Sequence, residues 1–473
     1  MPDLRLFSER PPAGELVVRS PYDGRELDRV ATGNEDHVDD ALTVAHALFR
    51  DRQRWLSVPE RIEILTKAAR IMESRVDDLT LTAASEGGKP YADSKVEVLR
   101  AIDGVHLCIE TLRSEPGSVI PIGTTTATLG RVAFTQKEPV GVVVAVSAFN
   151  HPLNLIVHQV GPAVATGCPV VIKPAEDTPL SCLAFVDILH EAGLPPEWCQ
   201  AIVADDIATA EALVTDARVG FFSFIGSARV GWMLRSKLKP GARCALEHGG
   251  AAPVILAEPF DPDAVVPAIS KGGFYHAGQV CVSVQRVFVP ASRAADFAEA
   301  LAAAASQLKV GPPEDPDTDV GPLIRTAEVD RVATWVEEAI NAGARLVTGG
   351  RKLSDTCYAP TVLLDPPVDA AVSTLEIFGP VVCVYGYEDI DSALEQANAL
   401  PVAFQAAVFT QDIDKAMYVY RHVDASAVMV NDHSAFRDDV MPFAGLRESG
   451  LGTGGIPYTM EDMSTDKMLV IKS

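Results

Sequence analysis

Four short patterns carry side chains that can perform nucleophilic catalysis beside a cofactor. They are 148–152 (AFNHP), 226–231 (GSARVG), 246–250 (LEHGG) and 278–281 (GQVC). A cysteine thiolate can add to an aldehyde carbon, and the resulting tetrahedral alkoxide releases hydride readily, so a cysteine suits a nicotinamide cofactor. Cys281 is therefore the candidate nucleophile.

Two further residues fit the same chemistry. A thiol with a pKa of about 8.5 is only slightly ionised near pH 7, so it needs a base. Glu247 can be that base, directly or through water, and can later activate water to hydrolyse a thioester. The amide of Asn150 and the backbone N–H of Cys281 can stabilise the oxyanion, each contributing about 2.7–4 kcal/mol. Taken singly, Asn150 could cap a turn, Glu247 a helix, and Cys281 could fill a core.

The 226–231 segment lies between a predicted apolar strand and a predicted helix. This position is typical of phosphate binding at a helix N-terminus, although a tight turn with a packed glycine is the alternative. The chain has no GxGxxG fingerprint of a dinucleotide site in this region. The segments 173–176 (KPAE) and 376–380 (EIFGP) complete the set.

Together these segments resemble the aldehyde dehydrogenase superfamily, from about residue 20 to residue 472. The resemblance implies NAD(P)-dependent oxidation with Asn150, Glu247 and Cys281 in the active site. It places Lys173 and Glu176 on the adenosine ribose, Ser227 on the pyrophosphate, and Glu376 with Phe378 on the nicotinamide ribose. The cofactor-binding residues so predicted are Lys173, Glu176, Gly226, Ser227, Gly249, Glu376 and Phe378.

The choice between NAD and NADP depends on Glu176. A carboxylate at the ribose accepts hydrogen bonds from the 2′-hydroxyl and repels a 2′-phosphate, which favours NAD. Lys173 could neutralise a phosphate, so NADP stays possible.

Three positions depart from the commonest family pattern: Phe149 replaces Trp, His248 replaces Leu or Met, and Thr465 stands where many members carry a second Glu. The last change leaves Glu247 as the sole candidate base. Its presence argues against the acyl-CoA-forming branch.

The segments 431–437 (NDHSAFR) and 441–445 (MPFAG) resemble the branch acting on small aldehydes that bear phosphate, phosphonate, sulfonate or carboxylate. In that branch, residues matching Arg437, Arg100 and His151 surround the substrate anion. One charge-assisted pair contributes about 1.5–3 kcal/mol. Alternatively, Arg437 pairs with Asp438 or Asp439 on the surface and Arg100 is solvated. A dehydrogenase of neutral, lactaldehyde-like aldehydes and a thioester or acyl-transfer enzyme without net oxidation are the alternative functions.

Alternating helical and strand-like periodicity predicts an α/β fold with a Rossmann-type NAD-binding domain and a second α/β catalytic domain. Residues 140–149 are a continuous apolar run, as expected for a central strand buried on both faces. We predict an NAD-binding domain at 1–121 and 139–249, a catalytic domain at 250–450, and a small β oligomerisation element at 122–138 and 451–473.

Four other segments give more local predictions. Residues 57–83 predict one amphipathic helix with Ser57 as its N-cap. A helix at 91–113 is expected to bury Val96, Leu99, Ile102 and Ile109, with Arg100 at the edge of that stripe. Residues 123–138 predict two strands around a Leu-Gly turn, and the tail at 467–472 predicts another. Because these strands have no evident partner within the two domains, we expect them to bridge subunits of a homodimer or homotetramer.

Composition limits the other partners. The chain of 473 residues has a net charge of −24, which argues against nucleic acid or an anionic membrane as a partner. No apolar run approaches the roughly 18 residues of a membrane span, and the N-terminus has no signal-like apolar region. Eight cysteines without CxxC or metal-ligand spacing predict a reduced, cytoplasmic protein with no metal site. The expected partner is a small aldehyde substrate.

Overall fold

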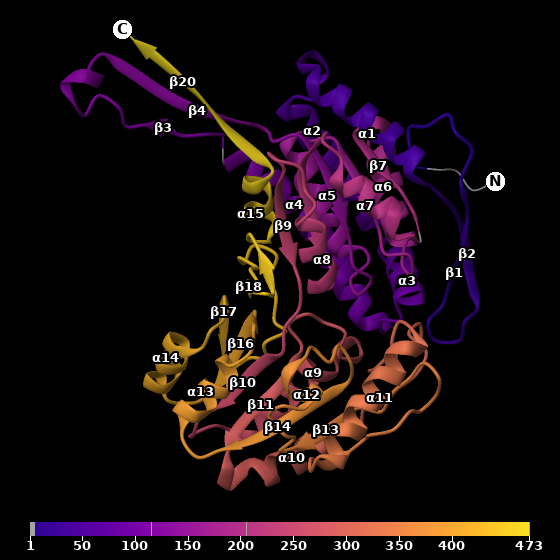
Figure 1. Cartoon of the computed structure of the whole chain (residues 1–473), viewed down its shortest axis with the longest axis vertical. Coiled ribbons are helices and arrows are strands. Elements are labelled where there is room, and N and C mark those ends of the chain that lie inside the picture. Colours follow the sequence, from indigo (N-terminus) through magenta and orange to yellow (C-terminus); the bar gives the residue numbers. More distant parts are fainter. Residues whose placement is uncertain (1–4, 115, 205, 473) are drawn as a thin grey trace.

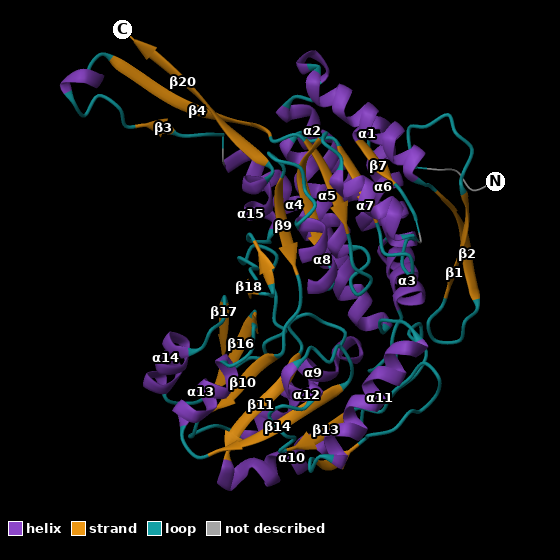
Figure 2. Cartoon of the chain, in the orientation of Figure 1, coloured by secondary structure: helices purple, strands orange, loops and turns teal. Residues whose placement is uncertain are grey.

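The computed structural model describes residues 5–114, 116–204 and 206–472. It shows two units, each built on its own β-sheet and covered by helices, and a β arm that projects from the first unit (Figure 1, Figure 2). This is the predicted α/β architecture. The predicted domain boundaries stay predictions, and their outermost residues, 1–4 and 473, lie outside the described part.

The first unit contains a six-stranded sheet with the order β19-β9-β8-β5-β6-β7. Its strands are β5 (Val142–Val146), β6 (Val170–Lys173), β7 (Cys199–Ala201), β8 (Val219–Ile225), β9 (Arg243–Glu247) and β19 (Gly450–Leu451). Val143 and Ala145 pack into one core, whereas Val142 and Val144 pack into the core on the opposite face. Because successive strand residues face opposite sides, the continuous apolar run predicted here is needed to fill both cores.

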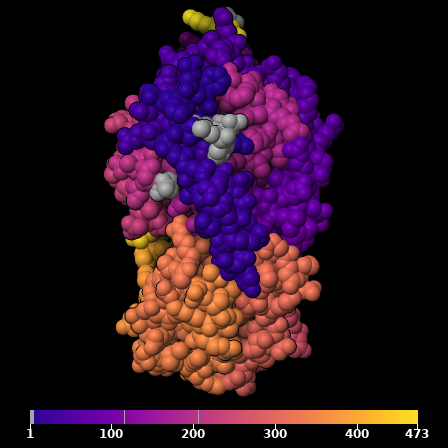
Figure 3. Space-filling view, turned by 90° about the vertical axis from the view of Figure 1, so that its right-hand side faces the viewer, coloured from indigo at the N-terminus to yellow at the C-terminus, as the bar shows by residue number. Residues whose placement is uncertain are grey.

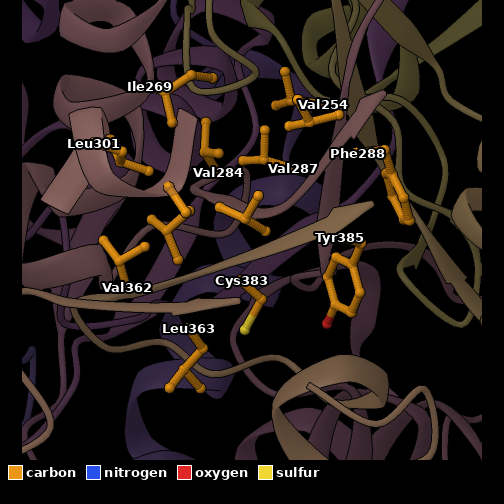
Figure 4. Close-up of a cluster of buried hydrophobic side chains, with 14 of the residues drawn as sticks. Val254, Ile269, Val284, Val287, Phe288, Leu301, Val362, Leu363, Cys383 and Tyr385 are labelled. Carbon is orange, nitrogen blue, oxygen red and sulfur yellow. The ribbon is translucent and has the colours of Figure 1, made fainter. Parts of the chain in front are cut away.

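The second unit contains a seven-stranded sheet with the order β12-β13-β14-β11-β10-β16-β17. Its strands are β10 (Ala252–Leu256), β11 (Val284–Pro290), β12 (Arg345–Thr348), β13 (Thr361–Leu364), β14 (Val381–Tyr387), β16 (Gln405–Phe409) and β17 (Ala427–Val430). Only the edge pair β12 and β13 is antiparallel. Figure 4 shows Val254, Val287 and Cys383 of adjacent strands in its core, with Leu301 reaching in from a helix.

Helices cover both sheets. In the first unit they are α1 (Glu35–Arg50), α2 (Val58–Ser74), α3 (Val76–Gly87), α4 (Tyr91–Ser114), α5 (Asn154–Thr166), α6 (Leu180–Glu191), α7 (Ile207–Thr215), α8 (Ala228–Arg235) and α15 (Ile456–Asp462). In the second unit they are α9 (Pro262–Phe274), α10 (Ala291–Ala305), α11 (Thr326–Asn341), α12 (Ala371–Thr374), α13 (Ile390–Asn398) and α14 (Ile413–His422). No helix in the described residues is long and apolar enough to cross a bilayer.

An N-terminal hairpin links the two units. It consists of β1 (Gly14–Arg19) and β2 (Glu26–Thr32). Figure 3 shows this indigo segment extending onto the orange second unit. At its tip, the carbonyl of Tyr22 accepts a hydrogen bond from Thr356 at 3.0 Å.

Two helix predictions need correction. The predicted helix at 57–83 is broken at Arg75 into α2 and α3, although Ser57 is the N-cap, in a capping box with Glu60. In α4 the predicted buried face is wrong in part, since Val96 and Leu99 are 56% and 51% exposed. The buried stripe includes Glu97, Val98, Ala101, Ile102, Val105, Cys108 and Ile109.

The β arm also differs from the prediction. Residues 126–128 form a single 3₁₀ turn, not a strand. The arm contains β3 (Val119–Ile120), β4 (Arg131–Pro139) and β20 (Ser464–Lys472). The tail strand β20 pairs with β4 along its whole length, so the two segments predicted to lack a partner are partners of each other.

Candidate active site

The two sheets bring their functional edges together. Asn150 follows β5, Ser227 follows β8, Lys173 ends β6 and Glu247 ends β9, all at the carboxyl edge of the parallel strands. This is the edge where open α/β sheets bind ligands. Cys281 comes from the opposite side, just before β11 of the second sheet.

A cavity of about 1380 Å³ lies between these edges, and every predicted site residue lines it. These residues are Arg100, Asn150, His151, Lys173, Glu176, Gly226, Ser227, Glu247, Gly249, Cys281, Glu376, Phe378 and Arg437. Ordinary ligand pockets have about 300–1,000 Å³. The cavity therefore has room for a dinucleotide and a small second molecule.

Cys281 is a neutral thiol at rest. Burial raises its pKa, and the charges of Glu376 and Glu247 raise it further, whereas Arg437 opposes the rise. Its proton must therefore leave as the sulfur attacks, which requires a base nearby.

Glu247 has the properties of that base. Burial raises its pKa to about 7, against the opposing charge of Arg437. A pKa near the working pH suits a group that both accepts and returns protons.

Thr465 was matched to the position of a second Glu, and the structure corrects this match. Thr465 lies on β20, paired with Glu138, so it does not occupy the position of a second acid. Gly454 faces Glu247 instead: a Cβ there would lie 2.1 Å from Glu247 Oε1. Glycine at 454 thus leaves space for the carboxylate.

Asn150 is held from two sides. Its Nδ2 donates to the carbonyl of Gln279 at 2.9 Å, two residues before Cys281. The backbone carbonyl of Asn150 accepts a hydrogen bond from Nζ of Lys89 at 3.1 Å. The amide carries a second hydrogen that can serve an oxyanion. Asn150 is thereby tied to the Cys281 loop.

Lys89 is a fully buried cation that was not predicted. It forms an ion pair with Glu97 and donates to Nδ1 of His151 at 2.7 Å. Because His151 Nδ1 accepts, its Nε2 carries the hydrogen. Burial and the charge of Lys89 lower the pKa of His151 well below its ordinary value. His151 is therefore a neutral donor, not a cation.

The predicted nicotinamide end contains an unsatisfied acceptor. Glu376 Oε1 is buried and has no hydrogen-bond partner among the described residues. Burial raises the pKa of Glu376 to about 8. A Cβ at Gly249 would lie 1.6 Å from this oxygen, so a larger residue there would displace the Glu376 carboxylate. A ribose hydroxyl could donate the hydrogen bond that Glu376 Oε1 lacks, so these residues fit a nicotinamide ribose. Phe378 packs edge-on against Phe149 at 5.9 Å.

The turn before α8 is fixed by hydrogen bonds. The N–H of Gly226 donates to the carbonyl of Glu247 at 3.1 Å, and Nδ1 of His248 donates to the Gly226 carbonyl at 2.8 Å. Ser227 is the N-cap residue of α8, and its side chain makes no capping bond. The helix N-terminus therefore faces the cavity in a defined orientation, as phosphate binding requires.

At the predicted adenosine end, Arg325 of the second unit contacts the acids of the first. It donates to Glu176 at 2.7 Å and forms an ion pair with Asp177. Lys173 Nζ lies 3.9 Å from Glu176. Arg325 was not predicted, since a lone arginine before a helix is typical of a surface.

The predicted substrate arginines converge on one acid. Arg100 Nε and Nη2 donate to Asp439 at 3.1 and 2.6 Å. Arg437 Nε lies 4.0 Å from the same carboxylate. The side chains of Arg437 and Asp439 are only 9% and 2% exposed. The alternative prediction that they form a pair on the surface is therefore wrong.

The family follows from the whole-chain match. The sequence model described as "Aldehyde dehydrogenase family" matches residues 9–469. The chain belongs to the aldehyde dehydrogenase family. It is accordingly an NAD(P)-dependent aldehyde dehydrogenase.

Three similar proteins cover nearly the whole enzyme. A 3-sulfolactaldehyde dehydrogenase of Priestia megaterium is 36% identical over 460 residues, 97% of this chain and 95% of the relative. The glyceraldehyde-3-phosphate dehydrogenase GapN of Methanocaldococcus jannaschii, complexed with NADP, has a TM-score of 0.92 and 32% identity, covering 97% of this chain and 99% of that one. Aldehyde dehydrogenase 21 of Physcomitrella patens, in complex with the reaction product succinate, has a TM-score of 0.93 and 33% identity, covering 99% and 97%.

Proposed function

We propose that this aldehyde dehydrogenase oxidises a small anionic aldehyde to the carboxylic acid and prefers NAD. The observation that carries the proposal is Arg437, whose Nη2 is buried without a hydrogen-bond partner among the described residues in the cavity that contains Cys281. An oxyanion would satisfy this donor. On a chain of net charge −24, such a substrate needs local cations. The sulfonate-bearing substrate named for one relative and the succinate bound by another are consistent with this proposal.

The proposed reaction assigns each residue a separate task. Cys281 attacks the aldehyde carbon while Glu247 accepts the thiol proton, directly or through water. The Asn150 amide and the Cys281 N–H hold the oxyanion. NAD(P) supplies the hydride acceptor. Glu247 releases the thiol proton to solvent and then activates the water that hydrolyses the thioester, which frees the carboxylic acid and returns Cys281 to the thiol.

The cofactor residues keep their predicted roles in this proposal. Lys173 and Glu176 would hold the adenosine ribose, Gly226 and Ser227 the pyrophosphate, and Gly249, Glu376 and Phe378 the nicotinamide ribose. The NAD preference rests on Glu176 and is opposed by the positive charge of Arg325 beside it.

The β arm supports a further part of the proposal, a homodimer or homotetramer. Met468, Leu469, Val470 and Ile471 of β20 are all about half exposed on a strand that projects from the body (Figure 1). Exposed apolar strands are typical of subunit contacts. All eight cysteines are free thiols, which supports the proposed cytoplasmic location.

Removal of Arg437 tests the substrate class. We compare kcat/KM for succinate semialdehyde and for butanal, which have similar length and differ in charge. Arg437→Leu should raise KM for the anion by about 10- to 100-fold, at 1.4 kcal/mol per factor of ten, and reduce the anion-to-neutral ratio accordingly. The exposed Arg113→Leu, which changes net charge equally, should preserve the ratio. An equal loss for both aldehydes with Arg437→Leu would favour a neutral-aldehyde dehydrogenase.

A further inference from the structure

Asp439 is a buried acid between the two arginines at the substrate end of the cavity. Arg100 binds both of its carboxylate oxygens, and His158 Nε2 lies 2.9 Å from Oδ1. The Arg437 guanidinium lies 4.0 Å away and stacks over the ring of Phe443 at 4.3 Å. One carboxylate therefore compensates part of the charge of two guanidinium groups.

The charges of this group can be counted. Although burial disfavours its ionised form, the pKa of Asp439 stays well below its ordinary value because His158 and Arg100 bind the carboxylate. Burial lowers the pKa of His158, which is therefore neutral near pH 7. Two guanidinium groups and one carboxylate leave one positive charge. His151, as shown above, adds none.

The other charged side chains at this end do not increase the net positive charge. Lys271 donates to Asp93 at 2.6 Å, and the buried Lys89 is paired with Glu97. Glu247 lies near Arg437 and is largely ionised at pH 8, because its pKa is about 7, so its negative charge further disfavours a second negative charge on the substrate.

From this geometry we infer that Asp439 is a specificity-determining residue that restricts the substrate to singly charged anions, carboxylate or sulfonate, against doubly charged phosphate monoesters. The inference rests on the proposed function and refines it. A single negative charge neutralises the group. A second one would remain uncompensated in a buried site, which is unfavourable. Phosphate monoesters carry this second charge at pH 8, since their second pKa is about 6.

Asp439→Asn tests the inference because it removes the charge and keeps the shape. At pH 8 we measure kcat/KM for succinate semialdehyde, glyceraldehyde 3-phosphate and butanal by NADH formation. The wild-type enzyme should prefer the carboxylate to the phosphate by tenfold or more. Asp439→Asn should raise the ratio of kcat/KM for the phosphate to kcat/KM for the carboxylate by about tenfold, which corresponds to about 1.4 kcal/mol. The exposed neighbour Asp438→Asn is the matched control and should leave the ratio within twofold.

A double variant distinguishes the effect of charge from a structural effect of the Asp439→Asn substitution alone. Arg100→Gln with Asp439→Asn removes the ion pair as a unit and leaves one positive charge on Arg437. It should return the phosphate-to-carboxylate ratio to the wild-type value. An unchanged ratio in Asp439→Asn, or a double variant that prefers phosphate, would overturn the inference while the preference for anions stands. If the wild-type enzyme does not distinguish succinate semialdehyde from butanal, the proposed function itself fails.

Discussion

Charged groups behave in opposite ways at the proposed reaction centre and at the proposed anion end of the same cavity. Around Cys281, burial raises the pKa of Glu247 to about 7 and that of Glu376 to about 8, so protons can move near neutral pH. At the anion end, Arg100 and Asp439 keep their charges because they bind each other. Proton transfer requires groups that change charge easily, whereas recognition of an anion requires charges that stay fixed.

Removing the proposed nucleophile should abolish the activity of the reaction centre. Cys281→Ala should abolish hydride transfer, because no alkoxide can form without the sulfur, while NAD still binds. NADH absorbance measures turnover, and calorimetric titration with NAD measures binding. Cys244→Ala, at the other cysteine that is not fully buried, is the control and should keep turnover. Normal activity in Cys281→Ala would place the nucleophile elsewhere.

Removing the base should separate the two halves of the reaction. Glu247→Gln should retain a single-turnover burst of NADH that is slower than in the wild-type enzyme, because the Cys281 thiol loses its base, and should lower steady-state turnover by about 10²–10⁴, the usual contribution of a general base. The reason is that thioester hydrolysis needs an activated water. Stopped-flow absorbance distinguishes the burst from the steady state. Wild-type steady-state turnover at saturating substrate would show that Glu247 is not required.

Arg437 lies close to both regions, so its charge should affect how kcat/KM depends on pH. With butanal, kcat/KM should rise with pH through about 7 and fall below it, because the Glu247 carboxylate must be ionised to accept a proton. The charge of Arg437 lowers the pKa of Glu247. In Arg437→Leu the rising limb should therefore move to higher pH. A limb that does not move would mean that the regions are electrostatically independent.

The adenosine end lies outside both regions and should change only cofactor choice. We expect kcat/KM for NAD to exceed that for NADP. Glu176→Gln should reduce this ratio by about tenfold, about 1.4 kcal/mol, because the repulsion of a 2′-phosphate is lost. Arg325→Leu should increase it. Equal use of both cofactors by the wild-type enzyme would show that Lys173 and Arg325 outweigh Glu176.

The smallest effect on chemistry is expected from the β arm. Deleting residues 466–473 removes most of β20 and should weaken assembly, because β4 loses its partner and the apolar strand is lost. Analytical ultracentrifugation over a concentration series measures this. A truncated enzyme that sediments like the full chain would contradict the subunit-bridging role.

Local sequence was sufficient to predict most strands and the residues that line one cavity as the candidate reaction centre. Asn150 and Ser227 follow apolar strand segments, and Glu247 ends another, so neighbouring parallel strands bring them to one edge. The helix break at Arg75 and the exposed Val96 could not be predicted from periodicity, because the helix continues to look amphipathic while its neighbours decide which side is covered.

Only the tertiary structure decided the electrostatics. Asp439 is two residues from Arg437 in sequence, which suggested a surface pair, but Arg100 is 339 residues away and makes the closer contacts. Lys89, in the loop before α4, and Glu97, on α4, likewise look like ordinary exposed residues in the sequence until folding buries them beside His151. The sequence determines which charges the chain carries. Burial, which depends on segments distant in sequence, determines which of them are compensated and which protons can move.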